Sequence, residues 1–103
     1  GGNNSIWYGY FIDNKLIGLC TIYEYNNVIF LYNFGIKQHF RNKGYGRKFL
    51  SEIIDIYKKN NKVMYIFVEK TNTIATKFYR SFNFKNSIMF YPPLNQFGMI
   101  KRF

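Results

Sequence analysis

The sequence Arg-Asn-Lys-Gly-Tyr-Gly at residues 41–46 lies between a segment patterned as a buried strand and a segment patterned as an amphipathic helix. The first N–H groups of a helix have no intrahelical acceptor, and the helix dipole adds about half a positive charge at this end. Glycine lets an anion approach the main chain closely, and the flanking Arg and Lys side chains add charge. The stretch therefore predicts a binding site for phosphate groups.

Three consecutive strands are predicted before this stretch. Trp7–Ile12 and Leu16–Tyr25 are rich in aromatic and β-branched residues, and the turn sequence Asp13–Lys15 separates them. Asn26–Asn27 forms a second turn, because Asn tolerates left-handed geometry. Val28–Ile36 follows and is apolar at nearly every position, which is typical of a central strand covered on both faces.

A helix and a further buried strand are predicted after the glycines. The helix has one apolar face and ends near Asn60–Asn61; the face comprises Phe49, Leu50, Ile53, Ile54 and Tyr57. Val63–Val68 is a continuous apolar run, too short for a free-standing helix. Strand, crossover helix and strand form a right-handed βαβ unit, so Val63–Val68 should run parallel to Val28–Ile36.

The last third of the chain predicts one helix and two strands. The helix begins near Asn72, with Thr71 or Asn72 as its N-cap, and its apolar stripe is Ile74, Ala75, Phe78 and Phe82. Ile88–Tyr91 is predicted as a strand that Pro92–Pro93 ends, and Phe97–Phe103 as the final strand. The order is β-β-β-α-β-α-β-β, an α/β fold of the α+β type with a mixed sheet.

Length and composition predict one domain over residues 1–103, with residues 1–5 disordered or left over from cloning. Hydrophobic residues make up 48% of the chain, which excludes a disordered tail, and no apolar run approaches the roughly 20 residues of a membrane helix. Cys20 and His39 are the only residues of their kinds, so no internal disulfide and no Cys/His zinc site is expected. We therefore expect a metal-free, cytoplasmic protein that does not enter membranes.

The net charge of +10 implies an anionic partner, and its distribution is more informative than its size. Five of the fifteen basic residues fall within twelve positions around the glycines: Lys37, Arg41, Lys43, Arg47 and Lys48. This clustering predicts a local anion site on a weaker general basic background.

Two stretches resemble the signatures of the GNAT N-acetyltransferase superfamily. Residues 33–46, a strand end followed by Arg41-x-x-Gly44-x-Gly46, resemble the acyl-CoA-binding signature that opens a helix. Residues 72–84 are similar to the second signature, Asn-x-x-Ala-x-x-Phe-Tyr followed by a Gly-Phe pair, with Asn83 in place of the Gly. Asn is the next-best residue for a left-handed helix cap, so this departure is conservative. The resemblance runs from about Tyr8 to the end and implies a GNAT-like fold with a splayed pair of central strands.

The resemblance implies an acetyl-CoA site and a direct transfer of the acetyl group to a primary amine on a small molecule or peptide. The coenzyme-binding residues it implies are Phe34, Gly35, Ile36, Lys37, Arg41, Asn42, Lys43, Gly44, Tyr45, Gly46, Arg47 and Asn72, with Lys48 adding charge. A backbone N–H near Ile36 would polarise the thioester carbonyl, and Tyr79 would protonate or hydrogen-bond the departing thiolate. The positive net charge favours an anionic amine as acceptor.

Two departures from the family leave the base and the acceptor wall open. Some relatives use a glutamate on the central strand as base, but Val28–Ile36 contains no carboxylate; Glu24 is the nearest candidate, and a water-relayed route is the alternative. The family also opens with a strand and two helices that wall the acceptor site, and the chain has almost nothing before its first strand. We expect either a compact member or a homodimer that covers the open side.

Two other functions stay open at this stage. A domain that keeps the fold and the coenzyme site without catalysis would be a coenzyme A sensor or an interaction module. The Lys43-Gly44-Tyr45-Gly46 sequence also matches the start of the RNA-binding RNP1 signature. That signature needs aromatic residues at alternate strand positions, whereas Arg47–Ile54 has a helical pattern, so nucleic acid is the less favoured partner.

Overall fold

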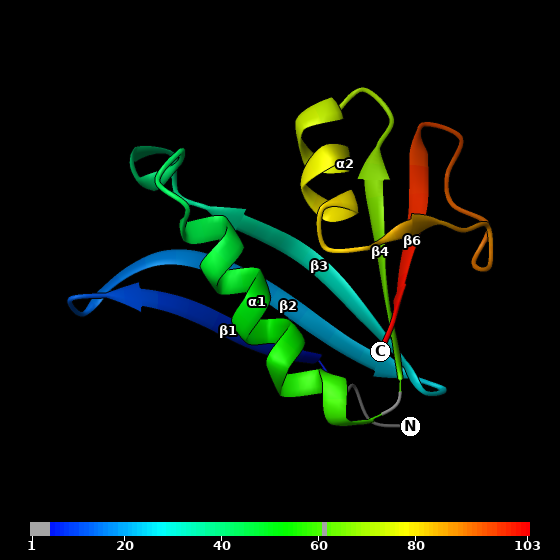
Figure 1. Ribbon diagram of the computed structural model, residues 1–103, viewed down its shortest axis with the longest axis horizontal. Helices are drawn as coiled ribbons and strands as arrows, with labels where there is room; N and C mark the ends of the chain where they lie inside the picture. Colours follow the sequence, from blue (N-terminus) through cyan, green and yellow to red (C-terminus); the bar gives the residue numbers. More distant parts are fainter. Residues whose placement is uncertain (1–4, 61) are drawn as a thin grey trace.

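The computed structural model describes residues 5–60 and 62–103 and contains one six-stranded mixed sheet with two α-helices (Figure 1). The strand order across the sheet is β1-β2-β3-β4-β6-β5. The strands are β1 (Ser5–Ile12), β2 (Lys15–Tyr25), β3 (Val28–Ile36), β4 (Val63–Glu69), β5 (Lys85–Asn86) and β6 (Gln96–Arg102), and the helices are α1 (Tyr45–Tyr57) and α2 (Thr73–Arg80). The predicted order of elements and the GNAT-like fold class are confirmed.

Strands β1 to β3 form an antiparallel meander joined by two tight turns. Asp13 and Asn14 have φ of 49° and 65°, and Asn26 and Asn27 have φ of 48° and 64°. Two consecutive left-handed residues match the right-handed twist of the flanking strands, which is why Asn and Asp occupy these positions. Both turns lie where the sequence predicts them.

Strands β3 and β4 run parallel, as predicted, but they pair over three residues only, Val28–Phe30 with Val63–Tyr65. Figure 1 shows the two strands close together where they start and far apart at their arrowheads. A bulge in β3 accompanies this parting: Leu19 pairs with Gly35 and Thr21 with Tyr32, so two residues of β3 face Cys20 alone. One of them, Asn33, has a φ of 55°, a left-handed conformation that bends the strand. The predicted splayed strand pair is confirmed.

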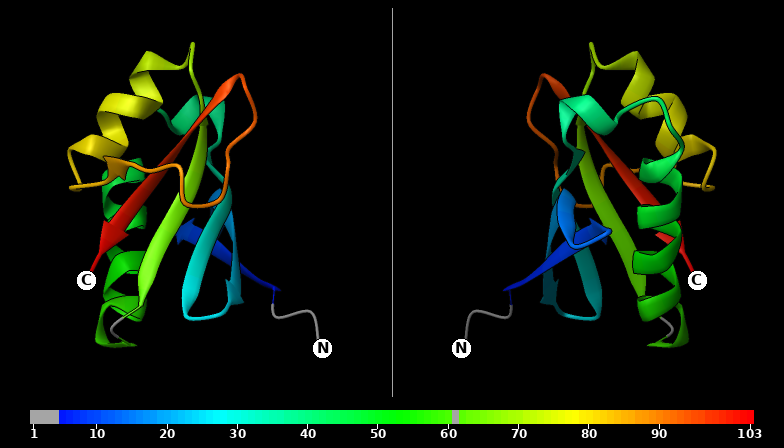
Figure 2. Two further views of the ribbon diagram at one scale, coloured as in Figure 1. Left: turned by 90° about the vertical axis from the view of Figure 1, so that its right-hand side faces the viewer. Right: turned by 90° about the vertical axis from the view of Figure 1, so that its left-hand side faces the viewer.

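Both helices cover the same face of the sheet, and the main core lies beneath them (Figure 2). Helix α1 buries Phe49, Leu50, Ile53 and Tyr57, the predicted apolar face without Ile54. Helix α2 buries Tyr79, and Phe84 after it is also buried. The predicted left-handed residue after α2 is confirmed, since Asn83 has a φ of 69° and the chain folds back so that the Phe84 N–H donates to the Tyr79 carbonyl at 3.2 Å.

The opposite face of the sheet carries an aromatic cluster with no helix over it in the described part of the chain. Phe90 belongs to the loop between β5 and β6 (residues 87–95). Its ring centroid lies 4.9 Å from that of Phe30 and 4.8 Å from that of Tyr65. The Tyr65 hydroxyl donates to the Ser87 carbonyl at 2.8 Å, which ties the loop to the sheet. Exposed aromatic rings remain at Trp7 and Tyr25, and the expected homodimer stays a prediction.

One predicted strand and two predicted boundaries are wrong. Ile88–Tyr91 is a turn, because Phe90 is drawn onto the aromatic cluster and Tyr91 takes a left-handed φ of 48°; β5 is instead the two-residue Lys85–Asn86. Ser5, expected to be disordered, begins β1 because it pairs with Tyr23; residues 1–4 lie outside the described residues. Helix α1 ends at Tyr57 and a 3₁₀ turn (Lys58–Asn60) follows, while Asn61 lies outside the described residues.

Among the glycines that the structure describes, Gly98 has the least room for a side chain, which gives a test of this packing. A Cβ there would lie 2.6 Å from the Ser87 carbonyl oxygen and closer still to the Tyr65 hydroxyl. We expect Gly98→Ala to lower the free energy of unfolding by about 3 kcal/mol, because the loop must detach from Tyr65. Gly35→Ala is the control, since a Cβ there has no atom within 4 Å. Urea denaturation of both variants with equal, small losses would contradict this packing.

Candidate functional site: two adjoining cavities along β3 and α2

The first cavity lies at the N-terminus of α1 and has a volume of about 420 Å³. Its lining residues are Ile36, Phe40, Arg41, Asn42, Gly44, Tyr45, Gly46, Arg47, Ile74 and Phe78. Gly44 is the N-cap with φ of 84° and Asn42 has φ of 62°, and such alternating turns make concavities of backbone N–H groups. Within the described residues, none of the N–H groups of residues 42–47 has an intramolecular acceptor, and the first helical bond is Lys48 N–H to the Gly44 carbonyl. We call this the anion cavity.

The basic side chains around the anion cavity differ in how they are held. The Arg41 Nε donates to the Ile36 carbonyl at 2.8 Å, which fixes this guanidinium at the end of β3. The Arg47 Nη1 donates to the Ser81 Oγ at 2.8 Å, and its guanidinium lies 4.6 Å from the Phe82 ring centroid. Both residues line the cavity, so both place positive charge beside the unpaired N–H groups.

The second cavity occupies the gap where β3 and β4 part and also has a volume of about 420 Å³. We call it the splay cavity, and it is lined by Leu31, Tyr32, Asn33, Phe34, Ile66, Phe67, Val68, Glu69, Asn72, Ala75, Tyr79 and Gln96. Since the β3–β4 pairing ends at Phe30, the later backbone groups of β3 on this side have no partner in β4. They are available to an extended, amide-bearing ligand. Helix α2 and the end of β3 line both cavities, which therefore adjoin.

Asn72 is the N-cap of α2, as the sequence predicts. Its Oδ1 accepts a hydrogen bond from the Ala75 N–H at 3.0 Å, and its carbonyl accepts from the Thr76 hydroxyl at 3.0 Å. Asn72 also lines the splay cavity. Capping uses only the side-chain oxygen, so the Nδ2 donor is left for a ligand.

Tyr79 lines the splay cavity from α2 and is 9% exposed. Its ring packs edge-on against the rings of Phe34 and Phe84, with centroid distances of 6.3 Å and 5.7 Å. Its hydroxyl has no hydrogen-bond partner among the described residues. Burial raises the pKa of the Tyr79 phenol above its ordinary value of 10, with a smaller contribution from Cys20. The hydroxyl therefore stays protonated across the neutral range and can donate a hydrogen bond into the cavity.

Several predicted site residues lie apart from both cavities. Glu24 is in an ion pair with Lys62 at 3.1 Å, opposite Ile29 on β3 and away from the parted end of the strand. Gly35, Lys37 and Lys43 flank the cavities without lining them, and the Lys37 N–H donates to the Ile17 carbonyl at 2.8 Å. The structure therefore brings Tyr79 and Asn72 together with Phe34 and leaves Glu24 outside this group.

Sequence reasoning missed Glu69 and Gln96, which line the splay cavity. The signal for Glu69 was its place, three residues before Asn72 and at the end of a buried strand. Gln96 carried no such signal, because it reaches the cavity only through the pairing of β6 with β4, where it lies opposite Glu69.

Cys20 and His39, the single cysteine and the single histidine, line neither the anion cavity nor the splay cavity. Cys20 is fully buried in the main core, and burial raises the pKa of its thiol to about 12, so it is a core residue rather than a nucleophile. His39 is exposed in a short turn. Among the residues that the structure describes, no three His, Cys, Asp or Glu side chains gather into a metal-binding group, and neither helix has the length and apolar character of a membrane span.

The family profile described as the acetyltransferase (GNAT) family matches residues 1–84 of the sequence. The chain belongs to the GNAT acetyltransferase family. The two stretches that resemble the family's signatures fall on functional positions of the fold: residues 33–46 cover the end of β3 and the start of α1, and residues 72–84 cover α2 and the turn after it. No curated protein matches this GNAT sequence.

Solved structures agree with the family assignment. The PaiA N-acetyltransferase from Thermoplasma acidophilum, in complex with coenzyme A, is 25% identical with a TM-score of 0.84, over 96% of this chain and 61% of that one. The ribosomal-protein-S18-alanine N-acetyltransferase from Escherichia coli is 19% identical with a TM-score of 0.79, over 97% of this chain and 68% of that one. A GNAT acetyltransferase from Elizabethkingia anophelis with acetyl-CoA bound is 16% identical with a TM-score of 0.81, over 94% of this chain and 75% of that one. At these identities, the Escherichia and Elizabethkingia structures show a shared fold alone. This GNAT chain spans less than two thirds of the length of the Thermoplasma protein.

The raised pKa of Tyr79 predicts a loss of stability at alkaline pH. The folded state favours the neutral phenol, so this stabilisation is complete below pH 10, the ordinary value, and is lost as pH rises towards the folded pKa. We expect Tyr79→Phe to change the free energy of unfolding at pH 7 by less than about 1 kcal/mol, because no hydrogen bond within the described chain is lost. Between pH 9 and 11, urea denaturation should show a smaller loss for Tyr79→Phe than for the parent. Equal losses would show that Tyr79 is not the buried phenol described above.

Proposed function

We propose that this GNAT chain is an N-acetyltransferase that moves an acetyl group from acetyl-CoA to a primary amine. The observation that carries the proposal is the position of Tyr79, a protonated phenol facing the gap between parted strands, beside a cavity of unpaired N–H groups. The complexes of the Thermoplasma and Elizabethkingia proteins with coenzyme A and acetyl-CoA support it. The cytoplasmic setting remains an expectation from the free thiol of Cys20.

The anion cavity fits the phosphate groups of the coenzyme. N–H groups at a helix N-terminus bind phosphate well, and the anion cavity offers those of residues 42–47. Arg41 and Arg47 would add charge from the lining, and Lys43 and Lys48 are next to lining residues in the sequence. The amide-bearing pantetheine arm would lie along Phe34–Lys37 and donate to or accept from the β3 groups that β4 leaves unpaired, with Asn72 Nδ2 as a further donor.

The chemistry assigned to the splay cavity is direct acyl transfer. The nitrogen lone pair forms a bond to the thioester carbonyl carbon, the carbon–sulfur bond breaks, sulfur leaves with the electron pair, and nitrogen loses one proton. An alkyl thiol has a pKa of about 8.5, below that of Tyr79, so complete proton transfer from the phenol is uphill by at least about 2 kcal/mol. Tyr79 would therefore act by donating a hydrogen bond to the sulfur as its charge develops, and a backbone N–H near Ile36 would do the same for the oxyanion.

The proton from the amine requires an acceptor other than Glu24. The ion pair of Glu24 with Lys62 holds this carboxylate outside the lining of the splay cavity. Water in the cavity is the route we propose, because the cavity is open to solvent and its volume of about 420 Å³ holds several waters beside a ligand.

Two alternative functions predict different results. A catalytically inactive module would bind acetyl-CoA without turning it over, and it would not depend on the Tyr79 hydroxyl. An RNA-binding domain would need stacked aromatic residues on a strand after Tyr45, but Arg47–Ile54 lies within α1.

Binding of acetyl-CoA is tested at Gly44. We expect Gly44→Val to weaken binding more than 100-fold, because valine does not tolerate φ of 84° and its side chain would enter the anion cavity. Asparagine tolerates this φ, so Gly44→Asn should keep the backbone and still lose about 10-fold or more through its side chain. Isothermal titration calorimetry measures the affinity of the parent and of both variants for acetyl-CoA and, in parallel, for a short single-stranded RNA.

The control for backbone strain is Asn27→Val, which places valine at φ of 64° in the β2–β3 turn, away from both cavities. This variant should lose stability and keep the acetyl-CoA affinity of the parent. Unchanged affinity in both Gly44 variants, or binding of RNA in place of acetyl-CoA, would refute the proposed coenzyme site.

Turnover is tested at Tyr79. We expect Tyr79→Phe to lower kcat by about 10²-fold and to leave the dissociation constant for acetyl-CoA within about two-fold, because the hydroxyl acts only as the thiolate forms. Release of free coenzyme A thiol in the presence of primary amines measures kcat. The control is Tyr57→Phe, which removes another buried tyrosine hydroxyl, bonded to the Tyr8 hydroxyl at 2.8 Å and outside both cavities. Full kcat in Tyr79→Phe at every pH would exclude the assigned role.

A further inference from the structure

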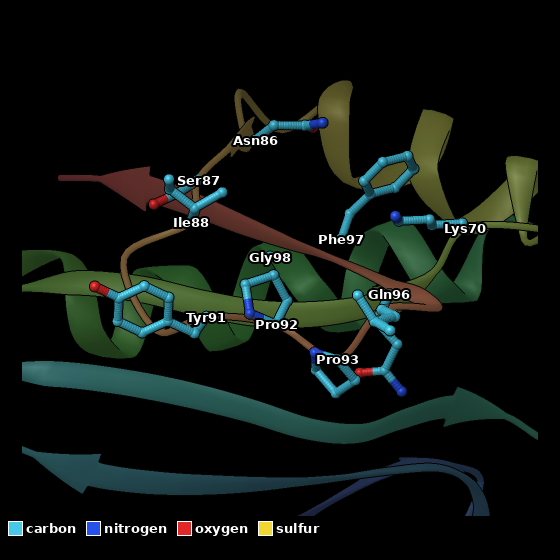
Figure 3. Close-up of a pocket in the computed structure, with 11 residues that line it drawn as sticks. Lys70, Asn86, Ser87, Ile88, Tyr91, Pro92, Pro93, Gln96, Phe97 and Gly98 are labelled. Carbon is cyan, nitrogen blue, oxygen red and sulfur yellow. The ribbon is translucent and has the colours of Figure 1, made fainter.

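A third cavity, of about 350 Å³, adjoins the splay cavity across Gln96, which lines both. It lies between β6 and the β5–β6 loop, and Figure 3 shows its lining residues. Apolar side chains dominate it: Ile88, Tyr91, Pro92, Pro93, Leu94 and Phe97. Three of these are large and highly exposed, Ile88 at 78%, Tyr91 at 87% and Leu94 at 95%. A cluster of exposed apolar side chains around a hollow favours an apolar ligand over solvent.

The wall of this apolar cavity is held in place at several points. At one end of the loop, Ser87 accepts from the Tyr65 hydroxyl and donates its N–H to the Gly98 carbonyl, both at 2.8 Å. At the other end, the Asn95 carbonyl accepts from the Lys70 N–H at 2.9 Å. Phe90 packs into the aromatic cluster between these ends. The cavity is therefore preformed, and a ligand would not have to order the loop.

Glu69 lies at the junction between the apolar cavity and the splay cavity. Its carboxylate accepts hydrogen bonds from Asn95 Nδ2 at 3.2 Å and from Gln96 Nε2 at 3.4 Å. The chain has five acidic residues, and Glu69 is the sole one among the described residues that line either cavity. Two neutral amide donors orient the carboxylate without neutralising it, so it can attract a cation in an otherwise basic protein.

The charge that lines the apolar cavity itself is positive: among the described residues its lining includes Lys70 and no acidic residue. The Lys70 Nζ lies 5.7 Å from the centroid of the Phe97 ring, and Figure 3 shows the two side chains beside each other. A cationic group is therefore disfavoured near Lys70 and favoured near Glu69. This polarity orients an amine with its nitrogen towards the splay cavity, where Tyr79 lies.

We propose that the acceptor is a primary amine on an uncharged apolar body, with its ammonium bound by Glu69 and its body in the apolar cavity. This inference rests on the proposed acetyl transfer, because it assigns the acceptor side of the same site. The bound ammonium must lose a proton before its nitrogen attacks, and Glu69 is assigned binding and orientation only. The positive net charge led us to expect an anionic amine, but the charges that line the site favour a cation at the reacting end.

The first experiment measures the rate of coenzyme A release with three amines: phenethylamine, ethanolamine and O-phosphoethanolamine. We expect the highest kcat/KM for phenethylamine, by about 10-fold or more over either of the others. Glu69→Gln keeps the size and hydrogen-bonding capacity of the side chain and should raise the KM for phenethylamine about 10- to 100-fold, with the KM for acetyl-CoA unchanged. Leu94→Ser should raise the KM for phenethylamine and leave that for ethanolamine unchanged. Glu52→Gln, on the exposed face of α1, is the matched control.

A binding experiment separates this inference from the proposed function. Calorimetry of the coenzyme A-saturated protein should show that phenethylamine binds, that phenethyl alcohol does not, and that Glu69→Gln abolishes the difference. Binding with this dependence but without turnover would support the acceptor site and overturn the transferase proposal. Turnover that is unaffected in Glu69→Gln, or that is fastest with O-phosphoethanolamine, would overturn the acceptor assignment and leave the transferase proposal standing.

Discussion

The parting of β3 from β4 is the constraint on which the rest of the site depends. A parallel pair normally continues its hydrogen bonds along both strands, yet this pair stops after Phe30 and Tyr65. The bulge at Asn33 bends β3 away, so its later backbone groups on the β4 side have no partner within the sheet. Unpaired backbone groups next to a cavity are costly unless water or a ligand satisfies them. The fold thus keeps a ligand-sized gap at the centre of its sheet.

Helix α2 and its N-cap close one side of this gap. Asn72 caps the helix at the mouth of the splay cavity, and Tyr79 lies two turns later with its ring fixed between Phe34 and Phe84. The same burial that holds the ring raises the pKa of the phenol above 10, so the hydroxyl stays a hydrogen-bond donor further into the alkaline range than an exposed tyrosine would.

The electrostatics of the molecule change sign over a short distance along this site. The anion cavity collects Arg41, Arg47 and the unpaired N–H groups at the start of α1. Beyond Tyr79, the lining carries one carboxylate, Glu69, which Asn95 and Gln96 orient. A ligand with phosphates at one end and a second ligand with an ammonium at the other would each meet the charge that it requires. This arrangement is consistent with a two-substrate transferase.

The sequence by itself determined the order of the elements, the two asparagine turns, the glycine junction and the caps at Asn72 and Asn83, because these depend on local periodicity and backbone preference. It also placed Tyr79 and Asn72 in the site through the family resemblance. Only the tertiary structure decided the roles of Glu24, Glu69 and Ile88–Tyr91. Glu24 forms an ion pair with Lys62 and does not line the splay cavity. Glu69 lies opposite Gln96 because β4 pairs with β6. Phe90 packs against Phe30 and Tyr65, and its segment forms a turn in place of the predicted strand. Each depends on a partner 25 or more residues away, which no local pattern encodes.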